Sequence, residues 1–202
     1  MSSPLTIHLP KASSALLVID VQEGFRQPPF ADLERSTPEF EANVDALLAA
    51  FRGAARHVIH VHHNSTEADS PFHPSKASAA PQAFAAPRPT ETVLIKKVHS
   101  AFIGTSLESL LRDQGIDTLV IAGLTTTHCI STTTRMAGNL GFKVYVPCDA
   151  VATFEQTTAP GSKLQTLNFD AETVQEVELG LLHNEFATVV ETNHVVDALA
   201  LP

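Results

Sequence analysis

The sequence is poor in the residues that mark several protein classes. It has 2 cysteines and no CxxC pair, which excludes a disulfide framework and leaves free thiols. Basic residues number 13 against 22 acidic ones, and the net charge of −9 argues against nucleic acid or an anionic membrane as a partner. No run approaches the ~20 apolar residues of a membrane-spanning helix, and the opening MSSPLTIHLPK lacks the order of a signal peptide. We therefore expect a soluble, cytoplasmic protein.

The chain does have enough apolar sequence for a substantial core. At 202 residues, 44% of them hydrophobic, its length suits one domain, and we expect residues 1–202 to form a single domain.

Short apolar runs rich in β-branched residues recur along this length. Continuous runs of this kind are typical of strands that are covered on both faces. The predicted strands are 15–20, 57–63, 92–96, 118–123, 143–147 and 187–191.

Segments with helical spacing lie between most of these runs. We predict helices after Thr37-Pro38, over 105–115, over 129–141 and after Asp170. In the last helix, the side chains expected to face the core are Val174, Val177, Leu181 and Leu182. Strands that alternate with helices predict an α/β fold, a three-layer α/β/α sandwich with a six-stranded, mainly parallel, Rossmann-like sheet.

Residues 64–91 do not fit the alternation. They are rich in proline, alanine and serine and are too long for a simple connection. We interpret them as an ordered excursion or lid.

Three chemically useful side chains stand at the ends of predicted strands. Asp20 ends the first strand, Lys96 ends the third, and Cys129 follows the fourth, where the chain turns into a helix. Taken singly, each residue is more often structural. Ligand sites of parallel sheets lie beyond the carboxyl ends of the strands, so the coincidence of all three at one edge favours a catalytic site.

These residue types suit the cleavage of an acyl bond. A helix N-terminus and a nearby ammonium both favour the thiolate form of a cysteine, and we expect Cys129 to have both. Asp20 can accept the thiol proton and pass it to a leaving amine, while Lys96 stabilises negative charge. Backbone N–H groups of the turn at 124–129 are expected to hold the oxyanion.

At these residues the sequence resembles the isochorismatase-like superfamily of cysteine hydrolases. This superfamily includes nicotinamidases, ureidoacrylate and carbamoyl amidohydrolases, and isochorismatase. The segments that carry the resemblance are LLVIDVQEGF (16–25), LIKKVHSAFIGTSLESLL (94–111), VIAGLTTTHCISTTTRMAGNLGF (120–142), VYVPCDAVATF (144–154) and HNEFATVVET (183–192).

The resemblance implies roles for individual residues. The Asp-Lys-Cys triad of the family falls on Asp20, Lys96 and Cys129. Lys96 is preferred to the adjacent Lys97 because the family's lysine stands four residues before the serine that is here Ser100.

The resemblance also implies a non-proline cis peptide bond between Leu124 and Thr125, with the amides of Thr125 and Cys129 as the oxyanion hole. Phe25 and His99 match positions that line the substrate pocket in nicotinamidase-like members. His128, which adjoins the nucleophile, is placed with them.

One part of the family pattern is missing. Metal-binding members carry an Asp-x-His element near the end of the second strand, where this chain has His62-His63-Asn64 and, further on, His73. We therefore expect no metal and no cofactor, although it stays open whether these histidines line the pocket or bind an ion.

The interpretation that follows is a hydrolase that cleaves an amide or carbamoyl-type C–N bond of a small-molecule substrate through a thioester on Cys129. The resemblance also implies a homo-oligomer, a dimer or a tetramer. Two alternatives remain: vinyl-ether hydrolysis of the isochorismatase type, which proceeds without the cysteine, and a non-catalytic ligand-binding α/β module. Neither GxGxxG nor GxxxxGK[ST] is present to support nucleotide binding.

Overall fold

A computed structural model gives the fold and describes residues 7–157 and 167–200. The strands are β1 (Ser14–Ile19), β2 (His57–His63), β3 (Thr92–Lys96), β4 (Thr118–Leu124), β5 (Lys143–Pro147), β6 (Val151–Ala152), β7 (Gln156–Thr157), β8 (Asn168–Phe169) and β9 (Thr188–Val190). The α-helices are α1 (Phe40–Gly53), α2 (Leu107–Asp113), α3 (Ser131–Asn139), α4 (Ala171–Leu182) and α5 (Thr192–Ala200).

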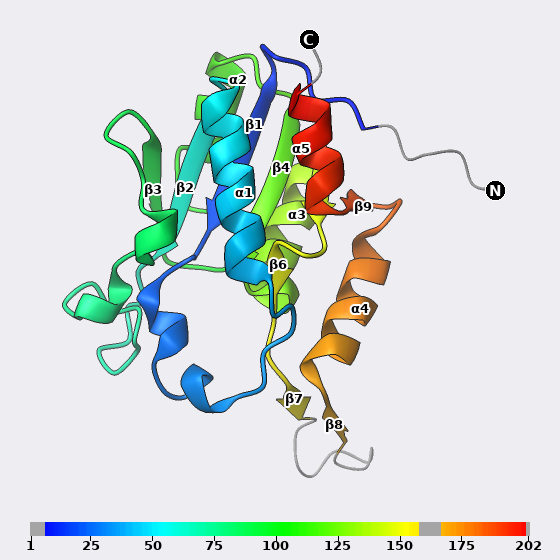
Figure 1. Ribbon diagram of the computed structural model, residues 1–202. Helices are drawn as coiled ribbons and strands as arrows, with labels where there is room; N and C mark the ends of the chain where they lie inside the picture. The colour runs from blue at the N-terminus through cyan, green and yellow to red at the C-terminus, as the bar shows by residue number, and fades with distance from the viewer. Residues whose placement is uncertain (1–6, 158–166, 201–202) are drawn as a thin grey trace.

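A parallel sheet runs through the middle of the molecule (Figure 1), and its strand order is β3-β2-β1-β4-β5-β9. Every pair along this path is parallel, and the short β6 adds a parallel pairing at the end of β4. These six strands are the six that the apolar runs predict, so the predicted fold class is confirmed.

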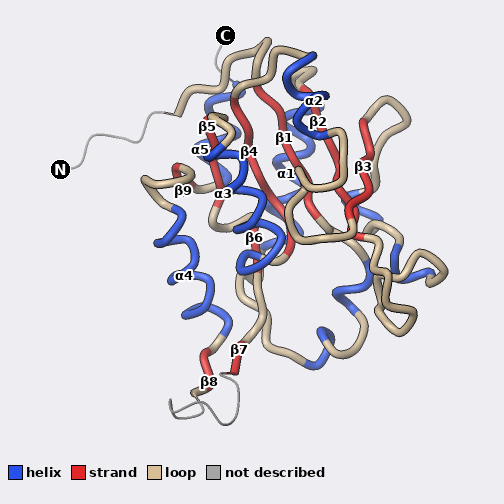
Figure 2. The backbone as a smooth tube through the Cα atoms, turned by 180° about the vertical axis from the view of Figure 1, so that it is seen from behind, coloured by secondary structure: helices blue, strands red, loops and turns tan. Residues whose placement is uncertain are grey.

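Helices cover both faces of the sheet and make two separate cores. On β1, Leu16 and Val18 pack in the core that includes the inner residues of α1 and α5. Leu17 and Ile19 pack on the opposite face, in the core with residues of α2, α3 and α4 (Figure 2). Because both faces are covered, β1 is buried along its whole length, and its sequence is a continuous apolar run.

The prediction for the buried face of α4 is partly wrong. Val177 and Leu181 are 60% and 58% exposed, whereas Leu182 is buried as expected. The rotation of the helix is set by a polar residue, the buried Gln175. Its amide donates to Thr37 Oγ1 at 2.6 Å and accepts from Ser36 Oγ at 2.7 Å, and a buried amide must keep such partners.

Two elements do not follow from the predicted pattern. The pair β7–β8 is a two-residue antiparallel ladder outside the main sheet. The helix α5 follows β9 and buries Thr192, Val195 and Leu199. Their spacing of three and four residues is helical, so the sequence does contain a signal for this helix.

Residues 64–91 fold back onto the segment that follows β1. The Gln82 amide donates to the Val21 carbonyl at 2.9 Å, and the Glu23 amide donates to the Ala80 carbonyl at 2.9 Å. The ring of Phe72 lies against Gly24, where a Cβ atom would come within 2.5 Å of the ring. Glycine at position 24 therefore lets these two loops meet below the sheet.

Among the described residues, no helix is both long enough and apolar enough to cross a membrane.

Candidate active site

The site lies at the carboxyl edge of the sheet, at the lower end of the strands in Figure 1. Asp20 directly follows β1, and its amide donates to the Val61 carbonyl of β2 at 2.8 Å. Asp20 adopts a left-handed backbone conformation with φ of 54°. On the other side of β2, His63 is paired in register with Lys96 of β3. The topology therefore brings Asp20 and Lys96 to the same edge.

β4 comes very close to β1 just before it delivers the nucleophile candidate. Gly123 pairs with Ile19 and has φ of 130°. A Cβ atom at this position would lie 1.9 Å from the Ile19 carbonyl oxygen. Only glycine suits this position, and the close approach places the following residues beside Asp20.

The turn after β4 holds the cysteine. A cis peptide bond joins Leu124 and Thr125, where the resemblance places it. A π-helical turn, Thr126–Ile130, follows and contains Cys129, so α3 itself begins two residues later than the predicted start at 129. The Thr125 carbonyl accepts hydrogen bonds from the His128 and Ile130 amides, both at 3.1 Å.

The three predicted side chains meet. Lys96 Nζ lies 2.6 Å from Asp20 Oδ2 and donates to Cys129 Sγ at 3.1 Å. Asp20 and Lys96 are each 1% exposed, and Cys129 is 7% exposed. Lys97, the competing lysine, is exposed, in agreement with the alternation of side chains along β3.

The electrostatics of the cysteine differ from the expected ones. Burial raises the pKa of the Cys129 thiol to about 12, and the negative charge of Asp20 adds to this effect, while Lys96 opposes it. The Lys96 ammonium acts in the expected direction, but burial and the Asp20 charge outweigh it, so the expected resting thiolate is not favoured. The thiol is protonated at neutral pH and needs a base before it can attack.

Asp20 is placed to be that base. Burial raises its pKa from the ordinary range, and the Lys96 ammonium and the Cys129 thiol act in the opposite direction. Lys96 occupies the Oδ2 oxygen. The other oxygen, Oδ1, is buried and has no hydrogen-bond partner among the described residues, so it is a free acceptor within the site.

His63 completes the surroundings of the ammonium. Its Nδ1 lies 3.5 Å from Lys96 Nζ, and burial, together with the Lys96 charge, lowers its pKa to about 4. The side chain of Gln22 holds the backbone of His63 at both ends, accepting from its amide at 2.8 Å and donating to its carbonyl at 3.1 Å. The imidazole is neutral near pH 7, and its Nδ1 can accept a hydrogen bond from the ammonium.

A pocket of about 300 Å³ opens onto Asp20 and Cys129. Phe25 and His99, the two positions that the resemblance assigns to the pocket, line it together with His128 and Thr125, and His99 Nδ1 lies 3.6 Å from Cys129 Sγ. The imidazole rings of His99 and His128 are 5.4 Å apart.

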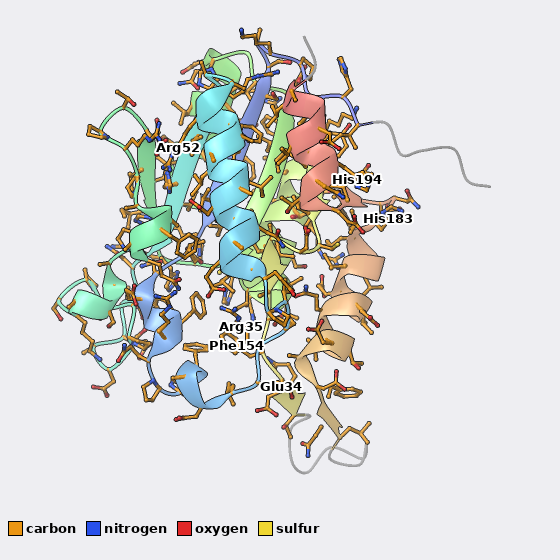
Figure 3. All side chains as sticks on the ribbon, in the orientation of Figure 1. Glu34, Arg35, Arg52, Phe154, His183 and His194 are labelled. Carbon is orange, nitrogen blue, oxygen red and sulfur yellow. The ribbon has the colours of Figure 1, made fainter. Side chains whose placement is uncertain are left out.

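Several lining residues are not among the predicted ones. The additional side chains are Phe30, Leu33, Phe72, Thr153, Phe154 and Gln156. Figure 3 shows Phe154 beside Arg35 below the sheet, and the two residues form an isolated antiparallel bridge. Phe154 lies two residues after β6, a strand that the apolar runs do not predict, so no sequence signal identifies it as a lining residue.

The remaining histidines have separate environments. His63 lines the pocket, whereas His62 does not, and burial lowers the pKa of His62 to about 4. His73 Nδ1 lies 2.7 Å from Ser75 Oγ. In the part of the chain that the structure describes, no group of three or more His, Cys, Asp or Glu side chains could hold a metal ion.

These observations define a class of protein. The fold is a parallel α/β/α sandwich, and at the carboxyl edge of its sheet a cysteine lies beside a carboxylate and an ammonium at a pocket of about 300 Å³.

Comparison with known proteins agrees with that class. Residues 14–193 match the isochorismatase domain. The uncharacterized isochorismatase family protein YrdC of Bacillus subtilis is 39% identical over 184 residues, which are 91% of this chain and 94% of YrdC. Maleamate amidohydrolase of Pseudomonas putida is 44% identical over 66 residues, which are 33% of this chain and 31% of that enzyme. A crystal structure of an isochorismatase family protein from Chromobacterium violaceum has a TM-score of 0.89 and 34% identity, with 98% of each chain covered.

The chain belongs to the isochorismatase family of hydrolases.

Proposed function

We propose that the protein hydrolyses an amide or carbamoyl-type C–N bond of a small molecule through a thioester on Cys129. The observation that carries this proposal is the position of the Lys96 ammonium, 2.6 Å from Asp20 Oδ2 and 3.1 Å from Cys129 Sγ at the bottom of a pocket. A thiol, a base and a fixed positive charge are the groups that acyl transfer requires.

In the first half of the reaction, Asp20 takes the thiol proton as Cys129 Sγ attacks the substrate carbonyl. The free Oδ1 oxygen is the acceptor, since Oδ2 is held by Lys96. The carbonyl oxygen becomes an oxyanion, and the amides of Thr125 and Cys129 are the proposed donors to it. As the C–N bond breaks, Asp20 returns the proton to the leaving nitrogen, and a thioester remains.

In the second half, water replaces the amine. Asp20, again ionised, takes a proton from the water, whose oxygen attacks the thioester carbonyl. The C–S bond breaks, and the proton returns to sulfur, so the acid is released and the thiol is regenerated.

Two features favour this reaction over the alternatives. The name of one relative, maleamate amidohydrolase, states the cleavage of an amide. Vinyl-ether hydrolysis needs no thiol, whereas here Cys129 accepts a hydrogen bond from a lysine that is itself paired with a buried carboxylate.

The test is ammonia release from a panel of small primary amides and carbamoyl compounds. Cys129→Ala is expected to reduce kcat by at least about 10³-fold, because it removes the nucleophile. Cys148→Ala is the matched control, since Cys148 is the other free cysteine and lies outside the pocket lining. Intact-mass measurement of the unaltered enzyme is expected to detect the acyl adduct at Cys129.

An equal loss in both variants, or full activity of Cys129→Ala, would rule the nucleophile out. Hydrolysis of a vinyl ether by Cys129→Ala at the unaltered rate would favour the isochorismatase-type reaction instead.

A further inference from the structure

The side-chain amide of Gln175 links α4 to the turn that carries the cysteine. Gln175 is 5% exposed, and its Oε1 atom accepts a hydrogen bond from Thr126 Oγ1 at 3.0 Å. Thr126 is fully buried and is the first residue of the π-helical turn Thr126–Ile130, which contains Cys129. It directly follows Thr125, whose amide is a proposed donor to the oxyanion. A buried amide on α4 is therefore joined to the turn at the reacting position.

The same amide is fixed by partners on other elements. Its Nε2 atom donates to Thr37 Oγ1 at 2.6 Å and to the carbonyls of Cys148 and Val151 at 3.0 and 3.2 Å. Ser36 Oγ donates to Oε1 at 2.7 Å. Turning the amide over would set Oε1 against two carbonyl oxygens, so the amide has one favourable orientation. The oxygen atom that Thr126 contacts is therefore held in place.

Gln175 and Thr126 act on the site through the turn. Neither belongs to the described residues that line the pocket. The hydrogen bonds within the turn, from the His128 and Ile130 amides to the Thr125 carbonyl, are local and do not fix where the turn lies in the molecule. The bond from Thr126 to Gln175 reaches a different element, so it does contribute to the position of the turn.

The position of this turn matters for acyl transfer. The turn carries the sulfur that attacks, and its amides are the proposed donors to the oxyanion. A displacement of about 1 Å in such groups costs up to roughly 10²-fold in rate, because attack requires a defined geometry.

We propose that Gln175 is a positioning residue, which holds the turn through Thr126 so that the Cys129 thiol and the oxyanion donors keep their places beside the carboxylate. The effect on turnover rests on the proposed function, whereas the ordering of the turn does not.

Thr126→Val tests the proposal, because it replaces the hydroxyl by a methyl group of similar size. With the best amide of the panel, we expect kcat to fall about tenfold while KM stays within about twofold. Thr126→Ser keeps the hydroxyl and is expected to retain at least about half of kcat. Thr134→Val is the matched control, because Thr134 is also fully buried and its Oγ1 has no hydrogen-bond partner among the described residues.

A double variant shows whether Thr126 acts through Gln175. Gln175→Met removes the amide and is expected to lower kcat at least as much as Thr126→Val. In the Gln175→Met protein, the further change Thr126→Val is then expected to cause no additional loss. A second tenfold loss in the double variant would overturn the inference. Thermal unfolding checks every variant, and if Gln175→Met does not fold, the comparison of Thr126→Val with Thr126→Ser and Thr134→Val decides.

Hydrogen exchange measures the turn without any substrate. NMR spectroscopy follows the His128 and Ile130 amides, with the amides of β1 as the reference for the stability of the whole fold. In Thr126→Val we expect exchange at His128 and Ile130 to become at least about tenfold faster relative to β1, whereas Thr134→Val leaves this ratio unchanged. A loss of general stability would speed exchange in β1 as well and would not move the ratio.

The two measurements separate this inference from the proposed function. If exchange changes as expected and no amide of the panel is hydrolysed, the proposed function fails while the ordering of the turn by Gln175 stands. If amides are hydrolysed and Thr126→Val keeps the kcat or the slow exchange of the unaltered enzyme, the inference fails while amide hydrolysis stands. Equal losses of kcat in Thr126→Val and Thr134→Val would also overturn it.

Discussion

At the scale of single residues, the proposed chemistry depends on the protonation states of three buried groups, the Asp20 carboxyl, the Lys96 amine and the Cys129 thiol. Lys96 holds Asp20 at 2.6 Å, and this pairing limits the rise in the pKa of the carboxyl that burial causes. The thiol, with a pKa of about 12, keeps its proton. In the mechanism that we propose, the same burial that makes a resting thiolate unfavourable makes a neighbouring carboxylate necessary as the base.

Asp20→Asn tests this dependence. We expect kcat to fall by about 10²- to 10⁴-fold, because the thiol loses its proton acceptor. Asp32→Asn is the control, since Asp32 is exposed on the surface. The substitution also leaves the buried ammonium of Lys96 without its charged partner, so thermal unfolding must accompany the rate measurement.

The pH profile of the unaltered enzyme gives an independent measurement of the same group. The active form of Asp20 is ionised, so kcat/KM should fall as the pH is lowered through the pKa of Asp20, which lies above the ordinary value of 3.8. A wild-type rate for Asp20→Asn would exclude Asp20 as the base, and an acid limb at or below 3.8 would contradict the raised pKa of its carboxyl.

At the scale of elements, the site depends on the close approach of β4 to β1. The Gly123 Cα faces the Ile19 carbonyl at a distance that leaves no room for a side chain, and Asp20 is the next residue after Ile19. A change at this contact therefore affects both the sheet and the position of the base.

Gly123→Ala is expected to reduce the free energy of unfolding by at least about 2 kcal/mol, since the added Cβ would lie 1.9 Å from the Ile19 oxygen at φ of 130°. Gly180→Ala in α4 is the opposite case, because nothing lies within 4 Å of its added Cβ, and we expect a gain of about 0.5–1 kcal/mol. Chemical denaturation measures both. Equal effects would contradict the close approach at β4.

The elements also explain why the sequence predicts that Asp20, Lys96 and Cys129 lie at one edge of the sheet but does not predict the buried face of α4. Asp20, Lys96 and Cys129 were accessible to sequence reasoning because an apolar run identifies a strand and parallel strands share one carboxyl edge. The outward face of α4 was not accessible in this way. The hydrogen-bonded Gln175 lies on the buried face of the helix, and this rotation leaves Val177 and Leu181 exposed. Buried hydrogen bonds of this kind leave no periodic pattern in the sequence.

At the scale of the whole molecule, an ion-pair network anchors the end of the excursion to the sandwich. Glu91 accepts from Arg52 Nε of α1 at 2.7 Å and lies 2.9 Å from His60 Nε2 of β2. Burial would raise the pKa of Glu91, but hydrogen bonds from Arg52, the Arg88 amide and His60 outweigh it and lower the pKa to about 2. The network joins residues 64–91, which carry Phe72, to the core.

The ionised form of Glu91 therefore stabilises the fold. Its pKa in the unfolded chain is near 4.5, so the contribution is fully present above that pH and is lost as the pH falls from about 4.5 through about 2. We expect Glu91→Gln to lower the free energy of unfolding at pH 7 by about 2 kcal/mol and to flatten its pH dependence in this window.

Denaturation at pH 7, 4 and 2.5 measures this effect, with Glu185→Gln as a control at an exposed glutamate. A Glu91→Gln protein that keeps the wild-type acid dependence would show that the network does not anchor the excursion.

The amino-acid sequence by itself determined the strand order along the chain, the α/β/α class and the three residues at the edge of the sheet. These follow from local apolar runs and from the rule that parallel strands end together. Only the tertiary structure decided the protonation of Cys129, the rotation of α4 and the assembly of the pocket lining from separate loops. Each of those depends on burial or on contacts between segments far apart in the chain, and neither is encoded in any short stretch of residues.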